Sequence, residues 1–187
     1  MKTLINFIFE TFHLKRIKHE WARLAGVDFP DSVAEHSLNA AQIGYILAMM
    51  EWADANKVSA MLIWHDVAET RIWDIHKVWS RYIHGKKEIE KKVMSEQLDW
   101  LEFGQDVQAL FDEYEERSTL EWKIAKDADY LEQAFQAKIW VEQGYSWMQN
   151  RIDNVGAALK TDSAKNVWEE MVKSSSNDWW EGLKKLG

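Results

Sequence analysis

Residues 30–50 read PDSVAEHSLNAAQIGYILAMM and contain the clearest helix start in the chain. Ser32 and Glu35 are three residues apart, the spacing of a capping box, in which each side chain binds a backbone N–H at the start of a helix. An apolar run follows, with Leu38, Ile43, Ile46 and Leu47. We therefore predict a helix that begins after Ser32 and carries His36 in its first turns.

The rest of the chain also has helical spacing, because apolar residues recur every three or four positions and strict alternation is scarce. Pro30 is the only proline, so no proline interrupts a helix after it. Further helices are predicted at about 56–68, 86–101, 107–114 and 164–172. Ser118 and Glu121 form a second capping box ahead of a helix of about two dozen residues. Residues 72–85 are expected to be irregular or to form a short helix.

These helices predict an all-α fold, a helical bundle in a single domain over residues 1–187, with a C-terminal helical tail at about 145–187. The 12 tryptophans, spread from Trp21 to Trp180, are expected mainly to fill the core. We expect the tail to pack on the bundle or on a partner subunit. The alternative is that Trp179 and Trp180 form a small exposed interface patch.

Composition excludes several classes of protein and site. Lys and Arg number 23 against 31 Asp and Glu, and this net charge of −8 argues against nucleic acid as the main ligand. There is no cysteine, so a metal site would need His and carboxylate ligands. No apolar run approaches the roughly 20 residues of a membrane span, and the opening MKTLINFIFETFHLKR is expected to be a helix of a cytoplasmic protein.

A group of polar residues in residues 65–75, HDVAETRIWDI, interrupts an otherwise apolar stretch. His65 and Asp66 are adjacent and are followed by Glu69 and Asp74, and such groups need partners if they are buried. His36, early in a different helix, and an aspartate of the long helix could join them at one point. Two imidazoles and two carboxylates form a ligand set that suits Mn²⁺, Co²⁺, Fe²⁺, Ni²⁺ or Zn²⁺. On periodicity alone, Asp127 and Asp129 both remain candidates for the late aspartate.

Three segments together resemble the HD-domain metal-dependent phosphohydrolases, in particular the branch of bacterial 5′-deoxynucleotidases and their archaeal and eukaryotic relatives. They are LKRIKHEWARLAGVDFPDSVAEHS, HDVAETRIWDI and KDADYLEQAF, and the likeness covers about residues 14–140. The resemblance implies a divalent metal, Mg²⁺ included, held by His36, His65, Asp66 and one late aspartate. By similarity to the family segment we choose Asp129, and Asp127 is then expected to be solvated or to support the metal ligands.

The same resemblance implies that Glu69 donates or accepts a proton and that Asp74 positions water or the sugar. Such a site would remove phosphate from a nucleotide-like phosphomonoester, in the first place a (deoxy)nucleoside 5′-monophosphate. Trp21, Arg16 and Lys77 are candidate substrate-binding residues, and Arg23 and Arg71 are further cations near the same segments. A homodimer is implied as well.

Two positions depart from the family pattern. The family usually has a glycine before the second aspartate, where this chain has Trp73, so the pocket wall is expected to differ. The deoxynucleotidases have an arginine where this chain has Glu20, whose carboxylate would repel a phosphate. These departures motivate a second hypothesis, a non-catalytic metal and nucleotide sensor. A third is a guanosine tetraphosphate pyrophosphohydrolase, although that branch has two adjacent acids where this chain has Ala68 and Glu69.

Overall fold

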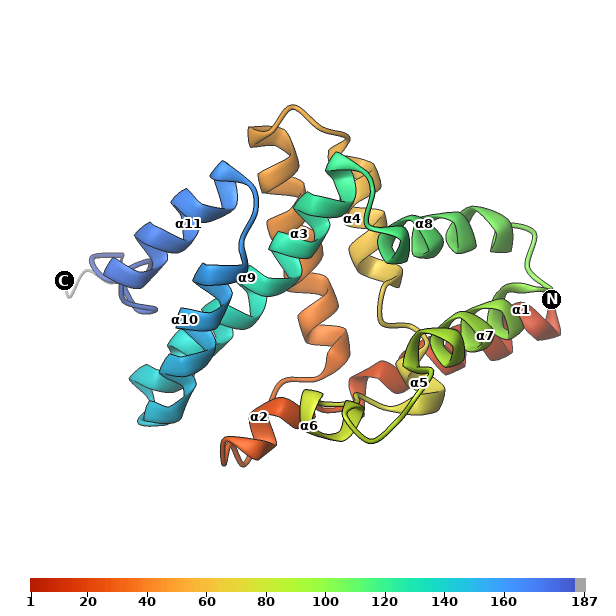
Figure 1. Cartoon of the computed structure of the whole chain (residues 1–187), viewed down its shortest axis with the longest axis horizontal. Helices are drawn as coiled ribbons and strands as arrows, with labels where there is room; N and C mark the ends of the chain where they lie inside the picture. Colours follow the sequence, from red (N-terminus) through yellow and green to blue (C-terminus); the bar gives the residue numbers. More distant parts are fainter. Residues whose placement is uncertain (184–187) are drawn as a thin grey trace.

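A computed structural model describes residues 1–183, and in this part of the chain it contains helices and no strand (Figure 1). The α-helices are α1 (Lys2–Thr11), α2 (Glu20–Leu24), α3 (Val33–Met50), α4 (Ala55–Trp64), α5 (Glu69–Ile72), α6 (Lys77–Ser80), α7 (Lys86–Leu98), α8 (Gly104–Glu116), α9 (Leu120–Glu142), α10 (Gln149–Ala158) and α11 (Asp162–Lys173). Two short 3₁₀ helices are η1 (Phe12–Lys15) and η2 (Ser146–Met148). The predicted all-α fold is confirmed. Residues 184–187 of the predicted tail lie outside the described residues.

Helix α3 is the central element, and it packs against both α4 and α9 (Figure 1). Its capping box is present as predicted, with the Ser32 hydroxyl accepting from the backbone of Glu35 and the Glu35 carboxylate accepting from the backbone of Ser32. The second predicted capping box is wrong: Thr119, not Ser118, caps α9 by accepting from the backbone N–H of Trp122. The long helix itself has 23 residues, close to the predicted length.

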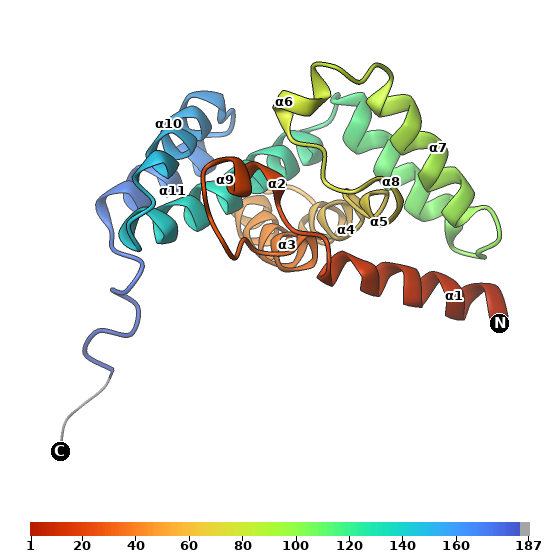
Figure 2. The ribbon, with the colours of Figure 1, turned by 90° about the horizontal axis from the view of Figure 1, so that it is seen from below.

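The remaining helices flank this centre on two sides. Helices α10 and α11 lie beside α9 on one side, and α1, α7 and α8 lie on the other (Figures 1 and 2). Helix α11 agrees with the amphipathic run predicted at 164–172, whereas α10 was not predicted. The segment 72–85, predicted to be irregular or to form a short helix, contains the short helix α6.

Asp127 has a structural role that differs from the predicted one. Its carboxylate is buried and accepts hydrogen bonds from the backbone N–H groups of Lys160 and Thr161 and from the Thr161 hydroxyl. The expectation that it is solvated or supports the metal ligands is therefore wrong, because it holds the connection between α10 and α11 against α9.

Most tryptophans are not in the core, contrary to the sequence-based expectation. Seven are exposed: Trp52, Trp73, Trp79, Trp100, Trp147, Trp179 and Trp180. Trp122 and Trp140 are buried within the core that α3, α4 and α9 share. Among residues 1–183, none of the helices has the length and apolar character needed to cross a membrane.

Candidate metal centre and active-site cavity

His36 is held by a buried carboxylate from another helix. Its Nδ1 donates a hydrogen bond to Oε2 of Glu132 on α9, and both side chains are buried. Burial alone would lower the pKa of His36, but its contacts with Asp129 and Glu132 outweigh burial and raise the pKa well above its usual value. Glu132 therefore fixes the ring so that Nε2 points toward the carboxylates of Asp66 and Asp129.

His65 and Asp66 come directly after the end of α4 rather than inside a regular helix. The helix predicted to continue to residue 68 ends at Trp64, and His65 is its C-cap. Nδ1 of His65 donates to the carbonyl oxygen of Leu62 at 2.7 Å, and Nε2 lies 3.0 Å from Oδ2 of Asp66. Burial alone would raise the pKa of Asp66, but the adjacent His65 lowers it to about 2.

Asp129 lies beside these residues, as the family resemblance implied. Its Oδ1 is 3.3 Å from Nε2 of His36. Its Oδ2 accepts hydrogen bonds from the ammonium of Lys126 at 2.6 Å and from the hydroxyl of Tyr114 at 3.1 Å. Burial would raise the pKa of Asp129, but Lys126 and His36 lower it well below its usual value. The ionised carboxylate of Asp129 therefore lies beside His36.

The chemistry of this donor set fits a divalent cation. His36, His65 and Asp66 offer ligand atoms that all lie within 4.8 Å of one another. Each imidazole donates through Nδ1, so Nε2 is the atom that each turns toward a carboxylate oxygen, of Asp129 for His36 and of Asp66 for His65. Nε2 of His65 has no hydrogen-bond partner among the described residues. Two Nε2 atoms that face ionised carboxylates need a positive charge between them, and a divalent cation would supply it in place of the proton that the raised pKa of His36 favours there. A hydrogen-bonded Nδ1 is the usual support of a metal-binding histidine.

Glu69 lines a cavity together with these residues, and its surroundings favour the protonated form of its carboxyl group. Its side chain is buried, and its Oε2 has no hydrogen-bond partner among residues 1–183. Burial raises the pKa of Glu69 well above its usual value, and the negative charges of Asp66 and Asp74 add to the effect. A carboxyl group whose pKa is raised in this way keeps its proton to a higher pH than a solvated one, which suits a general acid.

The two positions that depart from the family pattern both lie outside the cavity lining. The backbone N–H of Glu20 donates to Oδ2 of Asp74 at 2.7 Å, while its carboxylate pairs with Arg23 at 3.6 Å. Trp73 is half exposed and packs its ring against His13. Its φ of 66° is in the left-handed region that favours glycine. The expected change of the pocket wall by Trp73 is therefore not found.

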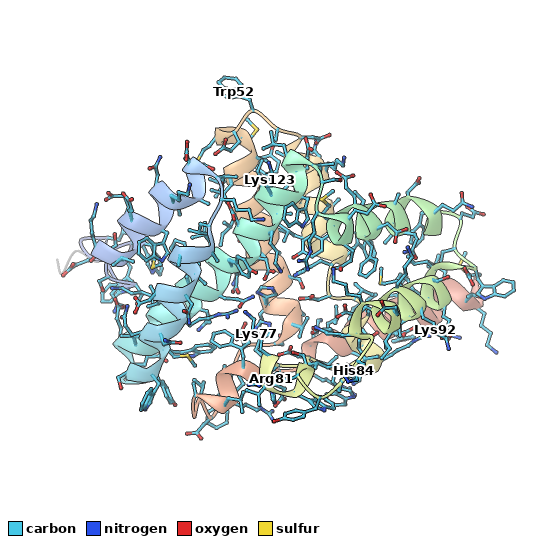
Figure 3. All side chains as sticks on the ribbon, in the orientation of Figure 1. Trp52, Lys77, Arg81, His84, Lys92 and Lys123 are labelled. Carbon is cyan, nitrogen blue, oxygen red and sulfur yellow. The ribbon has the colours of Figure 1, made fainter. Side chains whose placement is uncertain are left out.

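The cavity has a volume of about 390 Å³, within the range of small-molecule sites. Its lining includes the predicted residues His36, His65, Asp66, Glu69, Asp74, Asp129, Trp21 and Lys77. Figure 3 shows Lys77 toward the middle of the molecule, above Arg81 and His84 near its lower edge. Arg16 is exposed and lies outside the lining, and Arg23 and Arg71 pair with Glu20 and Glu10.

Several lining or supporting residues were not predicted. Glu132 had a usable signal, because it follows Asp129 by three residues and therefore lies one turn away on a helix whose face is otherwise apolar. Lys126 precedes Asp129 by three residues, so it had the same kind of signal. His19, whose Nδ1 bonds Asp31 at 2.9 Å, and Arg151 on the unpredicted α10 had no comparable signal.

Comparisons with known proteins agree with this geometry. The family model described as "HD domain" matches residues 12–172. A 5′-deoxynucleotidase of Dictyostelium discoideum, HDDC2, is 28% identical in an alignment of 148 residues, and the match covers 74% of this chain and 77% of that protein. A structural-genomics crystal structure is 32% identical with a TM-score of 0.78 and covers 96% of this chain and 99% of its own. A conserved hypothetical protein from Pyrococcus furiosus is 28% identical with a TM-score of 0.76, covering 91% and 99%.

Proposed function

The chain belongs to the HD domain family and is a metal-dependent phosphohydrolase, and on this premise we propose that it hydrolyses (deoxy)nucleoside 5′-monophosphates to nucleosides and inorganic phosphate. The similarity to a 5′-deoxynucleotidase supports this substrate class. The observation that carries the proposal is the position of Glu69, whose buried carboxyl group, with its raised pKa, lines the same cavity as the His36, His65 and Asp66 cluster.

His36, His65, Asp66 and Asp129 would hold the metal ion in this proposal. When bound there, a divalent cation supplies Lewis acidity toward water and the phosphoryl group. The ligand set is compatible with Mn²⁺, Co²⁺, Fe²⁺, Ni²⁺, Zn²⁺ or Mg²⁺, and metal analysis of the purified protein identifies the one retained.

The side chains of the cavity account for the proton transfers. The oxygen of water bonds to phosphorus, the bond from phosphorus to the 5′ oxygen breaks, and Glu69 gives its proton to the departing 5′ oxygen. Both protons of the water stay on the product, dihydrogen phosphate, and the carboxylate of Glu69 regains a proton from that product or from solvent. A positioned general acid of this kind contributes about 10²- to 10⁴-fold to the rate. Asp74, held by the backbone of Glu20, is then placed to orient water or the sugar.

The sensor hypothesis receives no support from the two residues that motivated it. The carboxylate of Glu20 pairs with Arg23, and Trp73 contacts His13, so neither side chain enters the cavity. Ala68, at the position where the pyrophosphohydrolase branch has an acid, is buried in an apolar cluster.

Phosphate release from a panel of ribo- and deoxyribonucleoside 5′-monophosphates, with each divalent metal in turn, tests the proposal. We expect turnover by the wild type and by His84→Ala, an exposed histidine outside the cavity lining. We expect none by His65→Ala, whose folding is checked by circular dichroism. Absence of metal-dependent release from every member of the panel would overturn the nucleotidase function. Ligand binding without turnover would favour the sensor.

A further inference from the structure

The cations that line the cavity differ in whether a carboxylate neutralises them. Six cationic side chains line it: Lys77, Lys86, Lys87, Arg117, Lys126 and Arg151. Three are ion-paired, Lys86 with Glu90 at 3.2 Å, Lys87 with Glu115 at 3.0 Å and Lys126 with Asp129 at 2.6 Å. Within residues 1–183 the other three, Lys77, Arg117 and Arg151, form no ion pair; Lys77 and Arg117 are exposed, whereas Arg151 is half-buried. Lys77 and Arg151 act on each other electrostatically, so these two cations are considered together.

Arg151 is held in place by aromatic side chains rather than by an acid. Its guanidinium carbon lies 4.9 Å from the ring centroid of Trp21, a cation–π distance. The other neighbour of the Trp21 ring is Trp140, at 5.5 Å and an edge-on angle. Nε of Arg151 is buried and has no hydrogen-bond partner among the described residues. Trp21 thus orients Arg151 at the cavity wall.

Lys77 lies close to Arg151 and faces the same centre. It is the first residue of α6, whereas Arg151 belongs to α10, so the two cations come from distant parts of the chain. Burial lowers the pKa of Lys77, and the charges of Arg151 and Lys126 lower it further. The charge of Asp129 acts on both Lys77 and Arg151 in the opposite direction. Both cations therefore lie within electrostatic reach of the proposed metal ligands.

Two unpaired cations in the lining of one cavity repel each other, and the half-buried Arg151 also loses hydration, so an anionic ligand offsets both costs. A phosphate dianion is the matching partner, because a guanidinium and an ammonium donate to several of its oxygens at once. The same cavity is lined by the histidines and carboxylates that suit a cation. A phosphomonoester bound in it would meet the positive charge of the two side chains as well as that of the metal.

We propose that Lys77 and Arg151 form an anion subsite that binds the non-bridging oxygens of the substrate phosphate, with Trp21 serving to position Arg151 rather than to stack on the base. The inference rests on the proposed phosphomonoesterase function, which it extends by assigning the recognition of the phosphate group to α6 and α10.

This assignment gives helices α10 and α11 a role in phosphate binding, because together they hold Arg151 in place. Ile152, next to Arg151, is buried in the main core, and its carbonyl oxygen accepts a hydrogen bond from Nε1 of Trp168 on α11 at 3.1 Å. A Cβ added to Gly156 would lie 2.5 Å from the Trp168 ring, so glycine permits the close approach of α11 to α10. Helix α11 thereby fixes the helix that presents Arg151.

Calorimetric titration with inorganic phosphate, on metal-free and metal-loaded protein, tests the subsite without turnover. We expect Arg151→Gln and Lys77→Gln each to weaken phosphate binding about 10- to 100-fold in the metal-loaded protein, as for a lost hydrogen bond to a charged group. Lys123→Gln, an exposed lysine outside the lining, is the matched control and should bind as the wild type does. 2′-Deoxyadenosine, which lacks the phosphate, should bind all four proteins equally.

The outcomes separate this inference from the proposed function. Unchanged phosphate affinity in both variants, or no phosphate binding by the wild type, would overturn the subsite even if nucleotides are hydrolysed. Affinity that depends on Lys77 and Arg151 in a protein that hydrolyses no nucleotide would retain the subsite and reject the nucleotidase. If Arg151→Gln does not fold, phosphate binding is measured on Arg151→Lys and Lys77→Gln instead. Arg151→Lys retains the charge but not the planar guanidinium, and unchanged phosphate affinity in both of these variants would overturn the subsite.

Discussion

Glu132 accepts a hydrogen bond from Nδ1 of His36 across 96 residues of sequence, and this contact sets which nitrogen of His36 faces the proposed metal. Both side chains are buried, so the pair also ties the start of α3 to the middle of α9. A carboxylate behind a metal-binding histidine orients the ring and increases its basicity. The contact therefore links the central helix packing to the chemistry of the site.

Replacing Glu132 by Gln should weaken metal binding about 10- to 100-fold, because the amide removes the negative charge behind His36 while retaining its shape. Titration with Mn²⁺ followed by calorimetry measures the effect. Glu121→Gln, on the same helix but outside the cavity lining, is the control. Equal Mn²⁺ affinity in wild type and Glu132→Gln would show that Glu132 does not orient the ligand.

Glu69→Gln should lower kcat about 10²- to 10⁴-fold and leave metal content unchanged, because the isosteric amide cannot release a proton to the departing oxygen. Steady-state kinetics on the best nucleotide substrate, beside elemental analysis, separates the two effects. Loss of metal together with activity would instead assign Glu69 to the ligand set, and undiminished kcat would remove it from the mechanism.

Metal removal should lower the melting temperature, since the cation binds only the folded arrangement of His36, His65 and Asp66. At a free metal concentration 100 times Kd, binding stabilises the fold by about 2.7 kcal/mol. For a domain of this size that corresponds to a shift of roughly 5 to 10 °C. Calorimetric scans with and without a chelator measure it. Asp66→Asn should abolish the shift, and a shift that persists in this variant would place the metal elsewhere.

Glu10 should contribute to stability in a pH-dependent way. Its carboxylate accepts hydrogen bonds from Arg71 and Gln97, joining α1 to α5 and α7. Burial alone would raise the pKa of Glu10, but these contacts lower it. The folded pKa is thus below the unfolded one, so the stabilisation is present above about pH 4.3 and is lost as the pH falls through the folded value.

At pH 7, Glu10→Gln should therefore lower the free energy of unfolding by about 1 kcal/mol, discounted for partial exposure. The difference from wild type should shrink in acid. Urea unfolding at pH 7 and at a pH below about 4.3 measures the difference in the free energy of unfolding and its decrease in acid. The exposed Glu169→Gln is the control. A difference that is constant with pH would mean that the charge of Glu10 is not the cause.

Trp73→Gly should stabilise the protein by roughly 1 kcal/mol, because a φ of 66° strains a bulky residue and glycine adopts it freely. Nucleotide hydrolysis should be unchanged, because the ring packs on His13 outside the cavity lining. Thermal unfolding measures the stability. A clear loss of stability would mean that the contact with His13 outweighs the backbone strain.

Much of the local structure followed from the sequence. The capping box at Ser32 and Glu35 places the start of α3 and hence the early position of His36. The helical spacing likewise predicts α4, which leads to the adjacent pair His65 and Asp66; that this pair lies near His36 was implied by the family resemblance rather than by a local pattern. These predictions succeed because caps and periodicity act over a few residues, which is the range that a single sequence reports.

The tertiary structure decided what depends on contacts between distant segments. It separated Asp129, beside His36, from Asp127, which holds the α10–α11 connection. It showed seven of the 12 tryptophans exposed, since periodicity identifies a helix face without showing whether a neighbour covers it. It also brought Lys77 and Arg151 into the lining of one cavity and left Arg16 outside it. The physical reason is that the packing of whole helices decides which charged side chains reach the site. A local sequence pattern does not report that packing.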